Sequence, residues 1–319
     1  MKILIASPID SSAIEILQER YEITCAFHAS EAELQSLIRD CAVLIFRSGV
    51  NISEDVMEAA PSLKLLVRAG SGLDNLDIDY VHRRGLKLVR IPGPGAQAVA
   101  ELTFGLILAL ARQIPEADRL LRIGHWAKHE LPGYLLSGKV LGIIGTGNIG
   151  SRVGELGAAW GLLVLGCIEH PGPERAASLL EKGIHLTDCL QVLAKSDFVC
   201  IHVPFKDNTR NLIGAQELML MKPGAFLINM ARGGVVNEQA LEQVLRESGR
   251  LRGAALDVHK SEGEGRVSAL AGLPNVILTP HIGSMTIDTQ RQIGERVVEI
   301  VDAFARNGAA GVKEDTAVM

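Results

Sequence analysis

The sequence has few aromatic residues, few cysteines and no excess of basic charge. Only 4% of its 319 residues are aromatic, and its five cysteines form no CxxC pair. Separate cysteines in apolar surroundings indicate reduced core thiols, so we expect neither a disulfide framework nor a metal site. The formal net charge is −5. The chain therefore lacks the basic field that a nucleic acid or an anionic membrane surface would require.

Long apolar runs are also missing. The longest run, 102–111, ends at Arg112, whereas a membrane-spanning helix needs about twenty residues. We therefore predict a buried helix at this place. The start of the chain, MKILIASPID, has too short an apolar stretch before Pro8 to act as an export signal. These observations predict a cytoplasmic protein that does not bind membranes.

The chain alternates between strand-like and helix-like patterns in two series. Strands are predicted at 2–6, 42–46, 64–67 and 87–90, and then at 140–145, 162–166, 198–203, 225–230, 253–258 and 276–280. Such alternation is typical of βαβ units and parallel sheets. Between the series, IPGPG at 91–95 breaks regular structure before a long helix predicted from Gln97. An apolar content of 47% is enough for two cores.

A glycine-rich motif, GTGNIG at 145–150, follows the apolar strand VLGII and precedes a helix predicted at 151–160. In a dinucleotide-binding turn, Gly145 permits the tight turn and Gly147 lets the backbone approach a pyrophosphate. Gly150 lets the helix pack on the strand, and the helix N-terminus attracts phosphate charge. The motif therefore predicts a bound dinucleotide.

The second strand of this series decides between NAD and NADP. Its end reads GCIEH, so Glu169 stands about twenty residues past the motif, where a carboxylate accepts hydrogen bonds from the adenosine ribose. No arginine cluster follows for a 2′-phosphate, and Arg175 is the nearest guanidinium downstream. We expect NAD, with NADP less favoured.

Several further segments carry a family resemblance. They are VRAGSGLDNLD (67–77), VAEL (99–102), GKVLGIIGTGNIG (138–150), HVPFKDNTRNLI (202–213), MKPGAFLIN (221–229), NMARGG around residue 232 and LTPHIGS around residue 281. The sequence resembles the D-isomer-specific 2-hydroxyacid dehydrogenase family, and most of all its D-3-phosphoglycerate dehydrogenase branch. The resemblance implies two doubly wound α/β domains: a Rossmann NAD-binding domain, 96–285, inserted in a flavodoxin-like substrate domain, 1–95 and 286–319. It also implies an active site in the cleft between them.

The resemblance assigns catalysis to Arg232, Glu262 and His281. Arg232 would bind the substrate carboxylate, His281 would donate and accept the proton, and Glu262 would partner the imidazole. Elementary chemistry supports these roles, because hydride addition to a ketone builds negative charge on oxygen, which a cation and a proton source stabilise.

The sequence departs from the family pattern around these residues. His259 and Gly263 stand where the family usually has phenylalanine and proline, so Glu264 could compete with Glu262 for the role. Ile168 occupies the place of the usual ribose-binding aspartate, which leaves the preference for NAD open.

Residue-by-residue matching extends the predicted sites. The cofactor groove is expected to include Gly145, Gly147, Asn148, Ile149, Gly150, Glu169, Val203, Pro204, Thr209, Met230, Ala231, Asp257, Gly283 and Ser284, with Asp257 facing the nicotinamide carboxamide. The anionic substrate is expected to contact Arg47, Arg68, Ala69, Gly70, Ser71 and Gly72, since guanidinium and backbone N–H groups suit carboxylate or phosphate oxygens.

These features predict an NAD-dependent oxidoreductase that moves a hydride between the nicotinamide and C2 of a small anionic D-2-hydroxy or 2-keto acid. Phosphoglycerate is the leading substrate, and the alternatives are a hydroxypyruvate, glyoxylate or phosphonopyruvate-type reductase. A non-catalytic NAD-sensing protein is a further hypothesis. The end of the chain leaves no room for an appended regulatory domain, so we expect a short form. The family's long helix and following arm imply a homodimer, with Trp126 covering the cleft or packing in the interface.

Overall fold

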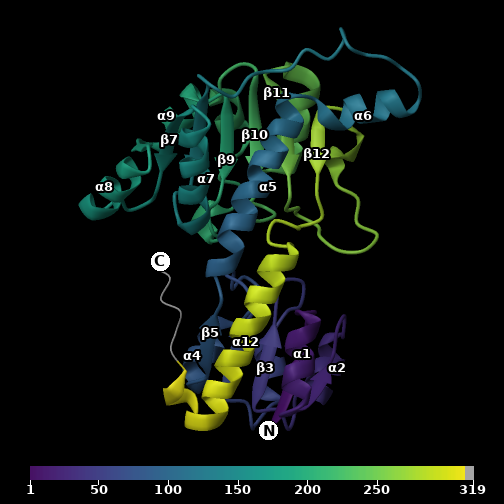
Figure 1. The fold of residues 1–319 in the computed structure, drawn as a ribbon, viewed down its shortest axis with the longest axis vertical. Coiled ribbons are helices and arrows are strands. Elements are labelled where there is room, and N and C mark those ends of the chain that lie inside the picture. Colours follow the sequence, from purple (N-terminus) through teal and green to yellow (C-terminus); the bar gives the residue numbers. More distant parts are fainter. Residues whose placement is uncertain (313–319) are drawn as a thin grey trace. The chain divides into compact units, whose positions relative to one another are not determined.

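The structure, a computed structural model that describes residues 1–312, divides into two compact units. Of the described residues, 1–95 and 284–312 form unit 1, and 96–283 form unit 2. The chain leaves unit 1 after strand β5 and returns to it before helix α12 (Figure 1). Residues 313–319, which belong to the predicted substrate domain, lie outside the described residues.

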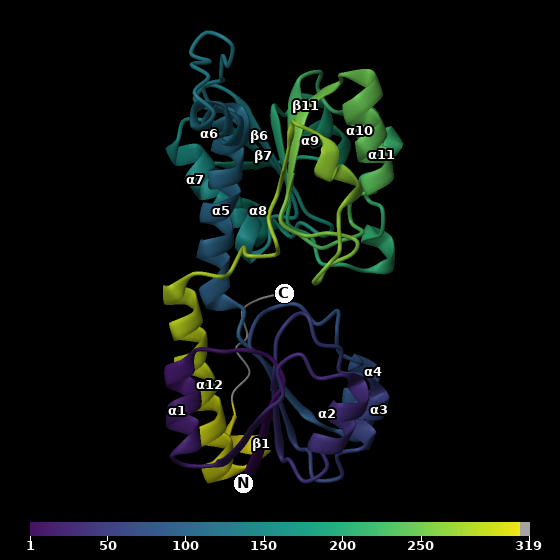
Figure 2. The same cartoon turned by 90° about the vertical axis from the view of Figure 1, so that its right-hand side faces the viewer.

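Unit 1 is built on a five-stranded sheet whose strands are all parallel. In spatial order the strands are β2 (Glu22–Cys25), β1 (Lys2–Ile5), β3 (Val43–Phe46), β4 (Leu65–Arg68) and β5 (Lys87–Arg90). This is the flavodoxin-like order. Helices α1 (Ser11–Gln18) and α12 (Ile287–Asn307) cover one face, and α2 (Glu31–Leu37), α3 (Glu54–Glu58) and α4 (Ile78–Arg84) cover the other (Figure 2).

The two faces of this sheet bury separate cores because successive side chains of a strand point to opposite sides. In β1, Ile3 and Ile5 belong to the core beneath α1 and α12, whereas Leu4 belongs to the core beneath α2, α3 and α4. Burial on both faces explains why the strands read as continuous apolar runs rather than as alternating patterns.

Unit 2 is built on a seven-stranded parallel sheet. In spatial order the strands are β8 (Ile184–Leu186), β7 (Leu163–Cys167), β6 (Val140–Ile144), β9 (Phe198–Ile201), β10 (Ala225–Asn229), β11 (Leu251–Leu256) and β12 (Val276–Leu278). This is the Rossmann order with a seventh strand added. The predicted fold class, two doubly wound α/β sheets, is therefore confirmed.

Helices cover both faces of this second sheet as well (Figures 1 and 2). One face is covered by α5 (Gly93–Ala111), α7 (Asn148–Ala159) and α8 (Pro173–Glu181), and the other by α9 (Cys189–Lys195), α10 (Ala215–Leu220) and α11 (Glu238–Gln243). Helix α6 (Ile114–Arg122) follows α5. Short helical turns lie at Asp207–Thr209, Val244–Ser248, Ala269–Gly272 and Ala309–Gly311.

The structure has two strands that the sequence pattern does not predict, and two helices begin earlier than the pattern predicts. Strands β2 and β8 lie at sheet edges, so they carry few buried residues and give a weak apolar signal. Helix α5 begins at Gly93 rather than Gln97, because proline is tolerated in the first turn, where its missing N–H costs no hydrogen bond. Helix α7 likewise begins at Asn148 rather than at residue 151.

Helix α5 is long and apolar enough, by length and composition, to cross a membrane, but half of its apolar window is buried inside the fold. Phe104, Ile107 and Leu110 lie in the core of unit 2. Buried core helices pass the same test of composition, and the predicted buried helix at 102–111 is confirmed.

Candidate active site

The loop between β6 and α7 has the geometry of a phosphate-binding turn. Gly145 has a φ of +96°, and a Cβ at Gly150 would lie 2.1 Å from the carbonyl oxygen of Gly145, so α7 packs against the loop as only glycine allows. Gly147 is the exposed N-cap of α7 and has no side chain to accept hydrogen bonds from the first N–H groups of the helix, and a Cβ there would meet nothing within 4 Å. Uncapped backbone N–H groups beside open space fit an anionic pyrophosphate.

Glu169 lies just beyond β7 and is exposed. Its Oε1 atom accepts a hydrogen bond from Nδ2 of Asn208 over 2.8 Å, a pairing that the sequence did not predict. Arg175 of α8 donates from Nη2 to the carbonyl oxygen of Thr146, inside the glycine loop, over 2.7 Å. The guanidinium nearest to Glu169 in the sequence is thus engaged with the loop backbone.

The other candidate cofactor residues lie at the carboxyl edge of the sheet, where ligands bind in open α/β folds. Asn148 and Ile149 open α7; Val203, Pro204 and Thr209 follow β9; Met230 and Ala231 follow β10; Asp257 follows β11; and Gly283 and Ser284 stand at the boundary between the units.

The carboxylate of Asp257 forms hydrogen bonds with three residues of the segment 279–283. Its Oδ1 accepts hydrogen bonds from the hydroxyl of Thr279 over 2.7 Å and from the backbone N–H of Ile282 over 2.9 Å. Its Oδ2 accepts from the backbone N–H of Gly283 over 2.8 Å. The sequence predicts Asp257 at the cofactor but gives no sign that this buried carboxylate shapes the turn that carries His281.

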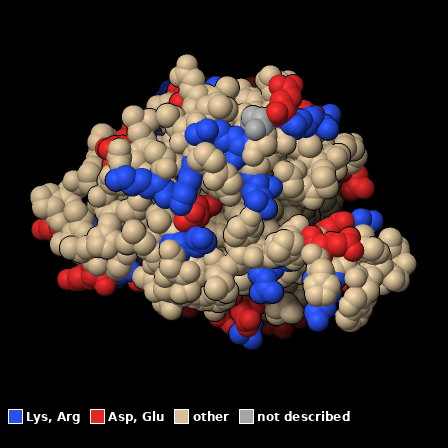
Figure 3. All heavy atoms as spheres, turned by 90° about the horizontal axis from the view of Figure 1, so that it is seen from above, with Lys and Arg blue, Asp and Glu red and all other residues tan. Residues whose placement is uncertain are grey.

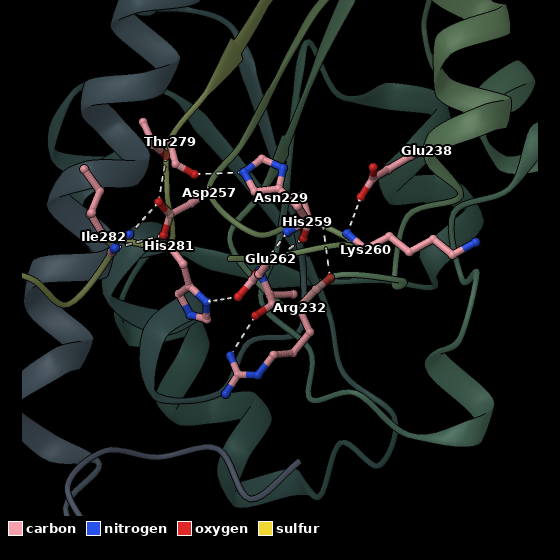
Figure 4. A network of polar contacts seen from close by, with 12 residues as sticks. Asn229, Arg232, Glu238, Asp257, His259, Lys260, Glu262, Thr279, His281 and Ile282 are labelled. Carbon is pink, nitrogen blue, oxygen red and sulfur yellow. Dashed lines mark hydrogen bonds and ion pairs between the residues drawn. The ribbon is translucent and has the colours of Figure 1, made fainter. Parts of the chain in front are cut away.

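His281 and Glu262 form a hydrogen-bonded pair, with Nδ1 of the imidazole 2.9 Å from Oε2 of the carboxylate (Figure 4). A carboxylate can only accept, so Nδ1 carries the hydrogen and Nε2 is the nitrogen that can exchange a proton. His281 has a φ of +53°, which is unfavourable for a residue with a side chain. Of the two neighbouring carboxylates, Glu262 and not Glu264 makes this bond.

The surroundings of Glu262 lower its pKa from the ordinary value of 4.5. Partial burial acts to raise the pKa, but the hydrogen bond and charge of His281, with the backbone N–H of His259, outweigh it. That N–H lies 3.1 Å from Oε1. Glu262 is therefore ionised at neutral pH and can stabilise an imidazolium.

Arg232 lies in the loop that follows β10. The side chain of Asn229 braces this loop: its Oδ1 accepts from the N–H of Ala231 over 3.1 Å, and its Nδ2 donates to the carbonyl of Arg232 over 3.3 Å. The guanidinium Nη1 donates to the carbonyl of Ala231 over 2.8 Å. Figure 4 shows the guanidinium on the same side of the strand ends as the His281–Glu262 pair, so the structure brings these three residues together.

The candidate substrate residues lie in unit 1. Arg47 follows β3, donates to the side-chain oxygen of Gln290 and is partly buried, which lowers its pKa. Arg68 is only 4% exposed, and its Nε donates to the carbonyl of Gly72 over 2.6 Å. This hydrogen bond therefore fixes the loop 69–72 from its buried side. Of the loop residues, Ala69 is buried, Gly70 and Gly72 are partly buried and Ser71 is exposed.

The chain belongs to the D-isomer specific 2-hydroxyacid dehydrogenase family, and residues 104–283 match that family's NAD binding domain. It is 40% identical over 97% of its length to a D-3-phosphoglycerate dehydrogenase of Methanocaldococcus jannaschii. It is 37% identical to a hydroxypyruvate reductase of Thermotoga maritima, over 93% of this chain and 96% of that protein. The family predicted from the sequence is thus confirmed.

The chain spans 58% of the length of the Methanocaldococcus phosphoglycerate dehydrogenase. Among solved structures, the D-lactate dehydrogenase of Aquifex aeolicus, complexed with NAD and lactic acid, matches with a TM-score of 0.85 and 28% identity, over 98% of this chain and 97% of that one.

Proposed function

We propose that the protein is an NAD-dependent oxidoreductase that interconverts a small anionic D-2-hydroxy acid and its 2-keto acid, with a phosphoglycerate-type substrate. The observation that carries the proposal is the 2.9 Å bond between His281 and Glu262, with Arg232 beside it, at the carboxyl edge of a family NAD binding domain. This arrangement places a proton donor and a cation where a ketone oxygen gains negative charge during reduction.

We assign the dinucleotide to the carboxyl edge of the sheet in unit 2. The N-terminus of α7 would hold the pyrophosphate, and Glu169, steadied by Asn208, would accept hydrogen bonds from the adenosine ribose. A carboxylate at this place disfavours a 2′-phosphate, which supports NAD over NADP. When bound, the nicotinamide supplies or receives the hydride.

The protein side of the reaction rests on three groups. Arg232 binds the substrate carboxylate and orients the C2 oxygen. His281 delivers the proton from Nε2 as the ketone becomes an alcohol, and removes it in the reverse direction. Glu262 fixes the imidazole through Nδ1 and stabilises its protonated form, because the lowered pKa keeps the carboxylate charged.

Unit 1 is proposed to be the substrate domain and unit 2 the cofactor domain. Arg47 and the N–H groups of the loop 69–72 would bind the anionic substrate. Arg68 would act through the loop that it supports.

We further propose a cytoplasmic homodimer. The segment 114–135, which begins with α6, exposes several large apolar residues. The exposed fraction is 70% for Ile123, 75% for Trp126 and 77% for Leu135. Exposed apolar side chains grouped in one segment favour a protein interface over contact with solvent. Sedimentation of Trp126→Asp and the parent protein tests this, and a parent protein that sediments as a monomer overturns it.

The first experiment measures NADH and NADPH oxidation with phosphohydroxypyruvate, phosphonopyruvate, hydroxypyruvate, glyoxylate and pyruvate. Selective turnover of phosphohydroxypyruvate with NADH is the expected result. His281→Ala should abolish turnover yet bind NADH, whereas His185→Ala, at an exposed position in β8, should behave like the parent. If the parent protein reduces none of these acids while still binding NADH, the proposal fails in favour of an NAD-sensing protein.

A further inference from the structure

His259 stands two residues after Asp257, and its imidazole donates to a backbone carbonyl. Nε2 lies 2.9 Å from the carbonyl oxygen of Thr279 (Figure 4). A carbonyl oxygen only accepts, so Nε2 carries the hydrogen. The other ring nitrogen, Nδ1, is buried and has no hydrogen-bond partner among residues 1–312. The bond to Thr279 is therefore the one hydrogen bond of this ring within the described chain.

The carbonyl that accepts this bond belongs to the turn that carries His281. The same Thr279 oxygen accepts the backbone N–H of His281 over 3.0 Å, and the carbonyl of Asp257 accepts that N–H over 2.8 Å. These bonds hold His281 at a φ of +53°, a conformation that costs free energy and persists only where the surroundings fix it. The imidazole of His259 thus fixes the carbonyl group of Thr279, which begins the strained turn at His281.

The backbone of His259 reaches the other two candidate catalytic segments. Its N–H donates to Oε1 of Glu262 over 3.1 Å. A Cβ at Gly233, the neighbour of Arg232, would lie 1.9 Å from the carbonyl oxygen of His259, so the arginine loop packs directly on this peptide. One residue therefore contacts the segments of Arg232, Glu262 and His281.

The backbone contacts do not depend on the ring. The N–H of the next residue, Lys260, donates to Oε1 of Glu238 over 2.6 Å, which fixes the chain on the far side of His259 (Figure 4). An exchange of the imidazole for another side chain of similar size should therefore leave the loop folded. It should remove the hydrogen bond to Thr279 and the electrostatic effect of the imidazole on the pKa of Glu262.

We propose that His259 is a positioning residue, whose Nε2–H sets the turn 279–281 so that His281 meets Glu262 in the geometry required for proton transfer. The inference rests on the proposed function. In this chain a hydrogen bond fixes the turn, whereas an apolar ring at position 259 could act only by packing.

The test compares His259→Phe, which keeps a ring but removes the donor, with His259→Gln, whose side-chain amide can restore it. Since Nδ1 has no partner among the described residues, glutamine replaces the ring's one hydrogen bond. We expect kcat to fall about tenfold in the phenylalanine variant, with little change in KM or in NADH affinity, because small misplacements of a catalytic group slow the chemical step. The glutamine variant should recover most of kcat, and His185→Phe is the matched control on an exposed histidine.

A second readout does not need turnover. In protein with ¹⁵N-labelled histidine, the His281 Nδ1–H that bonds to Glu262 should give a strongly downfield proton in the parent and glutamine variants, and a shifted or exchange-broadened one in the phenylalanine variant. Equal kcat and an unchanged His281 signal in His259→Phe would overturn the inference. If the parent reduces no keto acid, the proposed function fails, while the His281 signal still decides whether His259 positions the pair.

Discussion

Oδ2 of Asp257 accepts the backbone N–H of Gly283 over 2.8 Å, although the two residues are 26 positions apart in the chain. Because Oδ1 of the same carboxylate binds Thr279 and Ile282, one buried side chain sets the path of the segment that includes His281. Asp257 is 2% exposed, so solvent does not replace these bonds when they are lost.

Asp257→Asn should therefore destabilise the protein. In the asparagine variant an amide NH₂ group replaces either Oδ1 or Oδ2 and faces the backbone N–H of Ile282 or of Gly283. This exchange removes at least one strong hydrogen bond and leaves a backbone N–H buried without an acceptor. We expect a loss of about 3 kcal/mol in the free energy of unfolding. Denaturant unfolding measures this loss, with Asp118→Asn as control, since the side chain of Asp118 makes only an exposed ion pair with Arg122 among residues 1–312. A loss as small as that of the control would show that the turn does not depend on this carboxylate.

The glycine loop allows stability and cofactor binding to be separated. Gly150→Ala places a Cβ 2.1 Å from a carbonyl oxygen and should cost about 1–3 kcal/mol of stability, since α7 must move. Gly147→Ala places a Cβ in open space and should leave stability nearly unchanged, but weaken NADH binding at least tenfold by blocking backbone approach to the pyrophosphate. Unfolding curves and NADH fluorescence titrations check both. Unchanged NADH affinity in Gly147→Ala would place the pyrophosphate elsewhere.

Glu169 should set the choice of dinucleotide. Glu169→Gln removes the negative charge near a 2′-phosphate, and we expect the ratio of kcat/KM for NADH over NADPH to fall about tenfold. Asn208→Ala keeps the carboxylate but removes its hydrogen-bond donor, so it should change the ratio less. Steady-state kinetics with both cofactors measures the two variants. An unchanged ratio in Glu169→Gln would mean that another residue reads the ribose.

Sequence patterns predict the sheets, and the family resemblance of short segments predicts the candidate catalytic residues, because each rests on a local signal. The six consecutive residues GTGNIG are enough to predict a dinucleotide-binding loop, and His281 lies in the short segment LTPHIGS. The contacts that position these residues are not local. His259 and Thr279 are 20 positions apart in the sequence, and Glu169 and Asn208 are 39 positions apart. A short sequence motif therefore contains neither pair. The edge strand β8 was missed for a different reason, because an edge strand buries too little to give an apolar run.

The lowered pKa of Glu262 predicts how stability depends on pH. A carboxyl group with a folded-state pKa below the ordinary value of 4.5 binds fewer protons when folded than when unfolded, so its contribution is complete above pH 4.5 and is lost as the pH falls through the lowered pKa. The side chains of Glu262 and His281 are 40% and 29% exposed, so solvent screening limits the contribution to below about 1 kcal/mol.

Thermal unfolding of the parent and Glu262→Gln between pH 3 and pH 7 measures this dependence. The parent should have the higher Tm at pH 7, and the difference should shrink as Glu262 becomes protonated in acid. Glu264→Gln, two residues away on an exposed part of the same loop, is the matched control and should show no such trend. A difference between parent and Glu262→Gln that stays constant over this range would mean that the carboxylate charge does not stabilise the folded pair.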